Sequence, residues 1–404
     1  MLLRNATIAS GEVVDVAVAD GAIAAVGSDV AGDGETHDLT GYVLLPAAAE
    51  PHAHLDKALL GERFPNRTGD IPGALAAMKE AFPSITEDDV RARASRALLT
   101  AVRNGYTSVR THVNIEEGIG TRGLRALCDV RERFAALVDV EIVAMAGKPY
   151  SPHPVHQALL AEAIAAGADA VGGAPEFDPD PAATVRRLVA LAAEHGLPID
   201  LHLDETTNAS VFTLEVYAEE VIRRGLAGRA TASHCVSLGQ QSPQVARSAA
   251  RALAEAGVGV VTLPQTNLWL QGRSEATRVP RGLTTVRLLR EEGVVLAAGG
   301  DNCRDPFNPL GRIDPTETAA LLVAAAHVTS AEAWEAVSTN ARHVMGLSAY
   351  GVGPGSPADL VAMRARNIDD AVAAGEADRW VFRRGELVSR TRVVNDVEPM
   401  DLLA

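Results

Sequence analysis

The chain has 404 residues, of which 47% are hydrophobic, and it carries a formal net charge of −15 at pH 7. A chain of this size and composition can bury a large core, and we expect one big domain with a smaller one beside it. The negative charge argues against nucleic acid and against anionic membrane surfaces as partners. No signal peptide is visible in the first residues, and no apolar run approaches the length of a membrane span.

The cysteines indicate the compartment. Cys128, Cys235 and Cys303 are odd in number, lie far apart and form no Cys-x-x-Cys pair. A disulfide frame needs paired cysteines and an oxidising environment, so this pattern favours a reducing compartment. We therefore expect a cytoplasmic protein.

The two ends of the chain share a pattern of short apolar and polar groups separated by Asp-Gly and Arg-Gly turns. The pattern occupies residues 13–27, 358–363 and 380–389. Short strands joined by tight turns are typical of β-hairpins. We predict a small β-sandwich domain built from residues 1–46 and 350–404, with a larger domain, residues 47–349, inserted into it.

Eight apolar, strand-like runs follow one another in the middle of the chain, each separated from the next by a segment that can form a helix. The predicted strands are Tyr42–Ala48, Ser108–Val113, Val140–Met145, Ala168–Gly173, Pro198–His202, Arg229–His234, Val258–Leu263 and Val294–Ala298. Strands that alternate with helices predict a parallel sheet, and eight such units predict closure into a (β/α)8 TIM-like barrel. An open, doubly wound α/β sheet is the structural alternative.

One connecting segment carries a complete helix signature. Thr86 is a suitable N-cap, acidic residues fill the first turn, and Asn104-Gly105 is a typical helix end. The apolar positions between them share one face, as expected of a helix that covers a sheet. These positions are Val90, Ala94, Ala97, Leu98 and Ala101.

Metal-ligand residue types recur just past the apolar runs. His52 and His54 form a His-x-His pair, and residues two apart on a strand face the same side, so both rings can reach one ion. Later strand ends offer His112, His202, Glu205, His234 and Asp301. A single one of these is more often an ordinary polar residue, but the carboxyl ends of barrel strands meet at one face. The whole set therefore favours a functional site there.

The chemistry of a mononuclear hydrolytic metal site needs this set of residues. Such a site uses a few nitrogen and oxygen ligands and keeps a position open for water, whose pKa the metal lowers. Glu205 follows the strand-end histidine by three positions and can move a proton between water and substrate, and His234 can hold the water. The candidate ligands are His52, His54, His202 and Asp301.

With these residues, the chain resembles the amidohydrolase superfamily, in particular its cytosine deaminase-like branch. The resemblance covers nearly the whole chain and includes the motifs Glu50-Pro-His-Ala-His-Leu-Asp56, Val109-Arg-Thr-His-Val-Asn114, His202-Leu-Asp-Glu205, Thr231-Ala-Ser-His234, Leu270-Gln-Gly-Arg273 and Asp305-Pro-Phe-Asn-Pro-Leu-Gly311. It implies one divalent ion, Zn(II) or Fe(II), held by the four candidate ligands. It also implies catalytic roles for Glu205 as proton shuttle and for His234 and Asp301 beside the reacting water.

Departures from the cytosine deaminase pattern concern the substrate. Gly147 stands at or next to the position of a glutamine that pairs with the pyrimidine edge, and Lys148 follows it. Asn302 replaces an aspartate, Gly300 replaces a histidine, and Phe307 stands where that family has tryptophan. A missing buried hydrogen-bond partner costs much selectivity. We therefore expect a ring other than cytosine.

Five residues are candidate substrate contacts. Phe307 and Trp269 can offer flat apolar surfaces, and Gln271 can offer an amide for a ring carbonyl. Asn302 lies beside a candidate ligand, and Lys148 is either a contact to a substrate carbonyl or a solvated loop lysine.

The predicted function is metal-dependent hydrolytic deamination. The enzyme removes the exocyclic amine of a planar N-heterocycle, a cytosine-like, isocytosine, pterin, triazine or creatinine-type ring, and releases ammonia. The alternative is a cyclic amidase that opens a ring C–N bond. A binuclear form of it needs a bridging ligand, commonly a lysine after the fourth strand, and residues 171–176 contain none. A non-catalytic scaffold is a third reading. We expect a small heterocyclic substrate as partner and a homo-oligomer.

Overall fold

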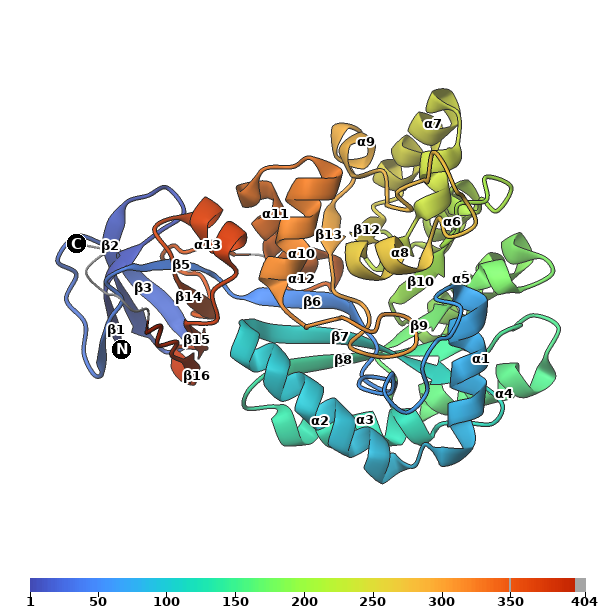
Figure 1. The fold of residues 1–404 in the computed structure, drawn as a ribbon, viewed down its shortest axis with the longest axis horizontal. Helices are drawn as coiled ribbons and strands as arrows, with labels where there is room; N and C mark the ends of the chain where they lie inside the picture. The colour runs from blue at the N-terminus through green and yellow to red at the C-terminus, as the bar shows by residue number, and fades with distance from the viewer. Residues whose placement is uncertain (349, 397–404) are drawn as a thin grey trace.

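The computed structural model describes residues 1–348 and 350–396, which form two eight-stranded sheets. Strands from both ends of the chain lie together on one side of the molecule, and the middle of the chain forms a larger barrel beside them (Figure 1). The prediction of a (β/α)8 barrel with a small β unit from both termini is confirmed. The exact domain boundaries stay predictions, because residues 349 and 397–404 lie outside the described residues.

The terminal sheet is mixed and curls around its own core. Its strands are β1 (Leu2–Thr7), β2 (Val13–Ala19), β3 (Ala22–Gly27), β4 (Thr36–Asp38), β5 (Tyr42–Pro46), β14 (Leu360–Arg364), β15 (Arg379–Arg383) and β16 (Glu386–Thr391). They are ordered β16-β15-β14-β5-β1-β2-β3, with β4 on β1. Leu3, Val16, Leu360 and Phe382 come from four of these strands and pack in one buried cluster, so strands from both ends of the chain share this core.

The prediction that Tyr42–Ala48 is the first barrel strand is wrong. Residues Tyr42–Pro46 form β5 of the terminal sheet, antiparallel to β14, and the barrel begins only at Ala48. The reason lies in the two faces of β5: Leu44 packs in the terminal core, whereas Val43 and Leu45 pack in the barrel core. A strand buried on both faces reads as a continuous apolar run, which is also how a barrel strand reads.

The barrel strands are parallel and consecutive in space. They are β6 (Ala48–Ala53), β7 (Tyr106–Ile115), β8 (Asp139–Ala146), β9 (Ala170–Gly173), β10 (Ile199–Leu203), β11 (Ala230–His234), β12 (Gly259–Thr262) and β13 (Leu296–Ala298). The barrel closes between β13 and β6, where the Asp301 amide donates to the His52 carbonyl at 3.1 Å. The Glu50 carboxyl group spans this seam, because it accepts from the amides of Gly300 at 2.9 Å and His52 at 3.2 Å.

Helices surround the barrel, and the last helix of the chain lies beside the terminal sheet (Figure 1). They are α1 (Ile71–Ala81), α2 (Glu87–Asn104), α3 (Arg122–Phe134), α4 (Pro154–Ala165), α5 (Pro181–His195), α6 (Leu214–Arg224), α7 (Pro243–Glu255), α8 (Pro264–Leu270), α9 (Val286–Glu291), α10 (Pro315–Leu321), α11 (Ser330–Val337), α12 (Thr339–Val344) and α13 (Ile368–Ala374). Helix α2 is as expected: the Thr86 side chain caps its N-terminus, and Gly105 ends it in the left-handed conformation. Within the described residues, no helix is both long and apolar enough to cross a bilayer.

Candidate metal centre and active site

The carboxyl ends of three barrel strands bring the four predicted ligands close together. His52 lies inside β6, His54 follows it, His202 lies on β10, and Asp301 follows β13. All four side chains are buried. Burial, helped by the neighbouring rings, lowers the pKa of His52, His54 and His202 well below the usual value. The three rings are therefore neutral, and each has one nitrogen with a free lone pair.

Hydrogen bonds fix which nitrogen carries that lone pair in two of the rings. The Ser233 hydroxyl donates to Asp200 Oδ1 at 2.8 Å, so its oxygen accepts from His52 Nδ1–H at 2.9 Å. His54 Nδ1–H donates to the His112 carbonyl at 3.1 Å, because a carbonyl oxygen can only accept. In both rings Nε2 is therefore unprotonated, and it faces the other candidate ligands. Such second partners commonly orient metal-binding histidines.

The Nε2 atoms of the three rings and one oxygen of Asp301 lie at close range. His202 Nε2 lies 3.1 Å from His52 Nε2 and 3.2 Å from His54 Nε2, and Asp301 Oδ1 lies 3.3 Å from His54 Nε2. Neither carboxylate oxygen of Asp301 has a hydrogen-bond partner within the described residues. Burial raises the pKa of Asp301 well above its usual value, and a cation among these atoms would favour the ionised carboxylate. Three imidazoles and one carboxylate therefore fit a divalent ion of the zinc or iron type.

A buried ion-pair network lies beneath these ligands and escaped the sequence analysis. Arg110 binds Asp200 at 3.0 Å and Glu141 at 2.7 Å. Burial pushes the pKa of Asp200 up, but His112 and Arg110 outweigh it and lower that pKa. Asp200 is thus held as the carboxylate that accepts from Ser233, and through Ser233 it sets the orientation of His52.

Three residues at the strand ends have the left-handed backbone conformation, which is strained for residues other than glycine. Asp204, His234 and Asp301 have φ angles of 55°, 71° and 61°. Non-glycine residues adopt this left-handed conformation at a cost on the order of 1–3 kcal/mol each, and such residues cluster at functional sites. Two of the three, His234 and Asp301, present their side chains to the same cavity.

Two candidate proton carriers lie beside the ligands. Glu205 Oε1 lies 3.4 Å from His234 Nδ1, and the Asn267 amide lies 3.1 Å from the same nitrogen. Burial, with the carboxyls of Asp301 and Glu176, raises the pKa of Glu205 well above its usual value, which favours the protonated acid. Burial lowers the pKa of His234 to about 3, so this ring is neutral. An acid and a neutral base thus stand side by side.

The cavity at the barrel mouth separates the predicted substrate contacts into two groups. Lys148, Asn302 and Phe307 line it together with His54, His202, Glu205, His234 and Asp301. The Asn302 amide is engaged inside the protein, since it donates to Asp305 at 2.9 Å and accepts from Thr266 at 3.1 Å.

Trp269 and Gln271 are not among the residues that line the cavity. Gln271 instead donates to the backbone carbonyl of Glu205 at 2.9 Å, and the Arg273 guanidinium covers the Trp269 ring at 4.3 Å. Gln271 therefore supports the segment that carries Glu205 from behind.

The cavity also contains residues that the sequence analysis missed. Ile71 and Leu75 reach it from α1, in the long connection between the first two barrel strands, and nothing in their local sequence marks them. Lys57 lines it as well, with its ammonium 4.8 Å from the centre of the Phe307 ring. Its position directly after His54-Leu-Asp56 was a signal that could have been used.

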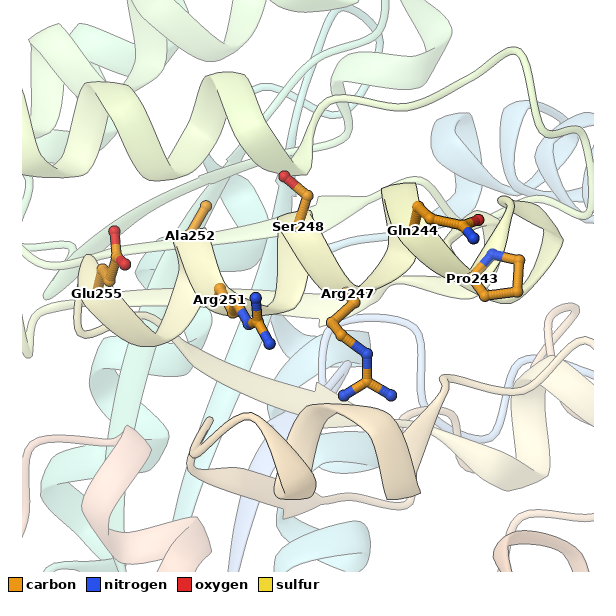
Figure 2. Close-up of a pocket in the computed structure, with 7 residues that line it drawn as sticks. All are labelled: Pro243, Gln244, Arg247, Ser248, Arg251, Ala252 and Glu255. Carbon is orange, nitrogen blue, oxygen red and sulfur yellow. The ribbon is translucent and has the colours of Figure 1, made fainter.

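A second hollow lies on the outside of the barrel, over helix α7 (Figure 2). The arginines Arg247 and Arg251 extend from α7 toward α9, and both form ion pairs with Glu292, Arg251 at 2.7 Å. One helix lines this hollow and its cations are already paired. It therefore lacks the converging polar groups that mark the barrel mouth.

Comparison with known proteins places this geometry in a family. A model of the amidohydrolase family matches residues 68–388. The chain is 31% identical to a pterin deaminase of Rhizobium rhizogenes over 411 residues, covering 96% of this chain and 94% of that protein. The chain belongs to the amidohydrolase family.

Two solved structures are similar over their full length. The 5-methylcytosine deaminase of Klebsiella pneumoniae superimposes with a TM-score of 0.92 at 28% identity, covering 99% of this chain and 100% of that one. The N-isopropylammelide isopropylaminohydrolase of Burkholderia multivorans gives a TM-score of 0.84 at 28% identity, covering 96% and 98%. The barrel and the terminal sheet are thus shared with these enzymes.

Proposed function

We propose that this protein is a metal-dependent hydrolytic deaminase that acts on a planar N-heterocycle with an exocyclic amine. The observation that carries the proposal is the pairing of a buried acid, Glu205, with a neutral base, His234, beside a cluster of unprotonated ligand atoms. Relatives named as deaminases of pterin and of 5-methylcytosine support the same reaction.

One divalent ion, Zn(II) or Fe(II), belongs to this proposal. Its ligands are His52, His54, His202 and Asp301. A bound ion of this class acts as a Lewis acid and makes water nucleophilic near neutral pH.

The chain's own residues then handle the protons. Asp301 and His234 hold the attacking water by hydrogen bonds and accept its proton. Glu205 protonates the ring nitrogen next to the carbon under attack, so that negative charge does not build up on the ring. The proton taken from the water passes to the exocyclic amine, the C–N bond breaks, and ammonia leaves. The remaining hydroxyl proton returns to Glu205 as the carbonyl forms, so that the acid is restored. The ring keeps a carbonyl in place of the amine, and water and substrate are consumed in equal amounts.

The walls of the cavity favour a flat ring. Phe307 and Phe177 line it together with the aliphatic side chains Ile71, Leu75 and Met145. Isocytosine, pterin, triazine and creatinine-type amines are the substrates we propose, with Lys148 and Phe307 as contacts. Asn302 becomes a contact when its amide leaves Asp305 or Thr266. Gln271 can bind a ring carbonyl only after its amide leaves the backbone carbonyl of Glu205. Trp269 can stack on the ring only after it leaves the Arg273 guanidinium.

A screen for released ammonia over these four classes of amine tests the proposal. The product is analysed by mass spectrometry, because deamination exchanges the amine for oxygen, whereas ring opening adds a whole water. Metal analysis of the active preparation is expected to give a single divalent ion per chain. Only ring-opened product, or two ions both needed for activity, would overturn the assignment.

A further inference from the structure

Lysine is rare in this chain, and its distribution is uneven. The sequence contains three lysines, Lys57, Lys79 and Lys148, among 37 lysines and arginines in total. Lys79 is exposed in the last turn of α1. The other two line the cavity at the barrel mouth. Arginine supplies nearly all surface cations, so two lysines in one small cavity are not part of a general surface pattern.

Both cavity lysines lack an anionic partner among the described residues. No carboxylate oxygen of the described residues lies within 4.0 Å of either ammonium. Lys57 is only 2% exposed, and the aromatic face of Phe307 is the group that its ammonium contacts. Removing an ammonium from water without a partner is costly, and two like charges in one cavity add to the cost. Burial lowers the pKa of Lys148, in line with this cost.

The acids that act on the two lysines are engaged elsewhere or mostly protonated, except that one oxygen of Asp56 has no hydrogen-bond partner among the described residues. Asp305 accepts hydrogen bonds from Asn302 and from two backbone amides. Glu116 accepts from Asn114 at 3.0 Å. Burial raises the pKa of Glu176 to about 8, so this carboxyl is mostly protonated at neutral pH.

Other buried cations in the barrel show the contrast. Arg93 donates to the carbonyls of Asp56 and Ala58 and pairs with Asp89, and Arg110 pairs with two carboxylates. Where this protein buries a cation for its own stability, it supplies acceptors. The two lysines instead line a cavity, and no such acceptors surround their ammonium groups within the described part of the chain.

We propose that Lys57 and Lys148 bind an anionic oxygen of the substrate ring, so that the enzyme selects acidic amino-heterocycles. This inference rests on the proposed function. Lys57 follows β6 and Lys148 follows β8, the two neighbours of β7, whereas Glu205 and His234 follow β10 and β11. The anionic oxygen therefore lies on the edge of the ring away from the amidine carbon that is attacked.

Two chemical groups can supply such an oxygen, a carboxylate substituent or an ionised ring lactam. Three matched probes separate them: 2-aminopyrimidine with no oxygen, isocytosine with a lactam, and 6-carboxyisocytosine with a carboxylate, together with the corresponding pteridines. Binding to the metal-loaded protein is measured by calorimetry, and deamination by released ammonia. Binding reports on the lysines even if no ring is deaminated, so failure of this inference and failure of the proposed function are distinguishable.

We expect the wild type to bind an oxygen-bearing probe more tightly than 2-aminopyrimidine. Lys57→Met is expected to weaken the binding of the anionic probe by about tenfold or more, which is the usual effect of losing a hydrogen bond to a charged group. The affinity for 2-aminopyrimidine is expected to stay nearly unchanged. Lys148→Met is expected to act in the same direction, and Lys57→Arg to restore most of the binding. The control Lys79→Met is expected to leave the affinity for all three probes unchanged.

If the two lysine-to-methionine variants at the cavity lost the same affinity for all three probes, or lost none, the inference would be overturned. A second measurement does not depend on variants. Reductive methylation of the wild type, mapped by mass spectrometry, is expected to label Lys79 at the same rate with and without the bound anionic probe. Protection of Lys57 and Lys148 by that probe supports the inference, and labelling of both at unchanged rates contradicts it.

Discussion

The buried charges of this barrel fall into two groups, one beneath the candidate ligands and one at the mouth. Beneath the ligands, Arg110 pairs with Asp200 and Glu141, and Asp200 also accepts from Ser233. At the mouth, Lys57 has no carboxylate within 4.0 Å, and both oxygens of Asp301 lack a hydrogen-bond partner within the described chain. The two groups lie in the same barrel but serve different ends: the first is complete without a ligand, and the second is completed by one.

The difference shows how to separate structural from functional charges. A paired buried charge destabilises the fold when one partner is removed, because the other is left alone in a poorly solvated place. An unpaired buried charge already carries its cost, so its removal relieves the fold and harms only binding. The following predictions test this contrast, from the largest expected effect to the smallest.

Arg110→Met is expected to lower the free energy of unfolding by about 3–5 kcal/mol, since it leaves Asp200 and Glu141 without their cation. Chemical denaturation of the metal-loaded protein measures the change. The control is Arg366→Met, which breaks an exposed i,i+4 pair with Asp370 and is expected to change the unfolding free energy far less, because solvent screens that pair. Equal effects of the two variants would contradict the contrast.

Glu205→Gln is expected to reduce turnover of the best substrate by a factor on the order of 10² or more, because the amide cannot donate and recover a proton. Metal content and unfolding free energy are expected to stay near the wild-type values. Glu194→Gln, on the exposed face of α5, is the matched control. Near-normal turnover of Glu205→Gln would assign the proton transfer to another group.

Ser233→Ala is expected to weaken metal binding by about 10–100-fold, the usual effect of losing the partner that orients a ligand histidine. The physical reason is that His52 Nδ1 loses its acceptor, so the ring no longer has a fixed tautomer. Competition with a chelator measures the affinity. Ser248→Ala on the outer surface of α7 is the control (Figure 2). Unchanged affinity would show that the Asp200–Ser233 chain has no part in holding the ligand.

Lys57→Met is expected to leave the unfolding free energy unchanged or to raise it by about 1 kcal/mol, opposite in sign to Arg110→Met. The methionine fills similar space beside Phe307 without a charge to desolvate. Thermal and chemical denaturation without substrate measure this effect. A loss comparable to that of Arg110→Met would mean that Lys57 has a structural partner after all.

The sequence predicted the barrel and pointed to the cluster of candidate ligand residues because both depend on local signals. His52, His54, His202 and Asp301 each follow or end an apolar run, and parallel strands deliver their ends to one face. The mistaken first strand had a different cause, since β5 is buried on both faces by two cores that meet only in the folded chain.

Long-range contacts explain what the sequence did not reveal. Arg110, Asp200 and Ser233 come from three strands, and each alone looks like an ordinary polar strand residue. Asn302 looked free to contact substrate, yet Thr266 and Asp305 engage its amide. The pairing of a side chain depends on packing between distant segments, and no spacing within a segment encodes it.

The candidate metal centre lies at the seam between β6 and β13, where the barrel closes, so a bound ion would stabilise that closure. β13 has only three residues, and its edge meets β6 through the Asp301 amide and the carboxyl group of Glu50. The ligands lie on both sides of this seam, His52 and His54 on one and Asp301 on the other. A cation shared by them ties the last strand to the first, so its binding free energy also opposes local opening there. Amide hydrogen exchange at Asp301 therefore reports metal loading directly, as the slowing of one backbone proton, without substrate or turnover.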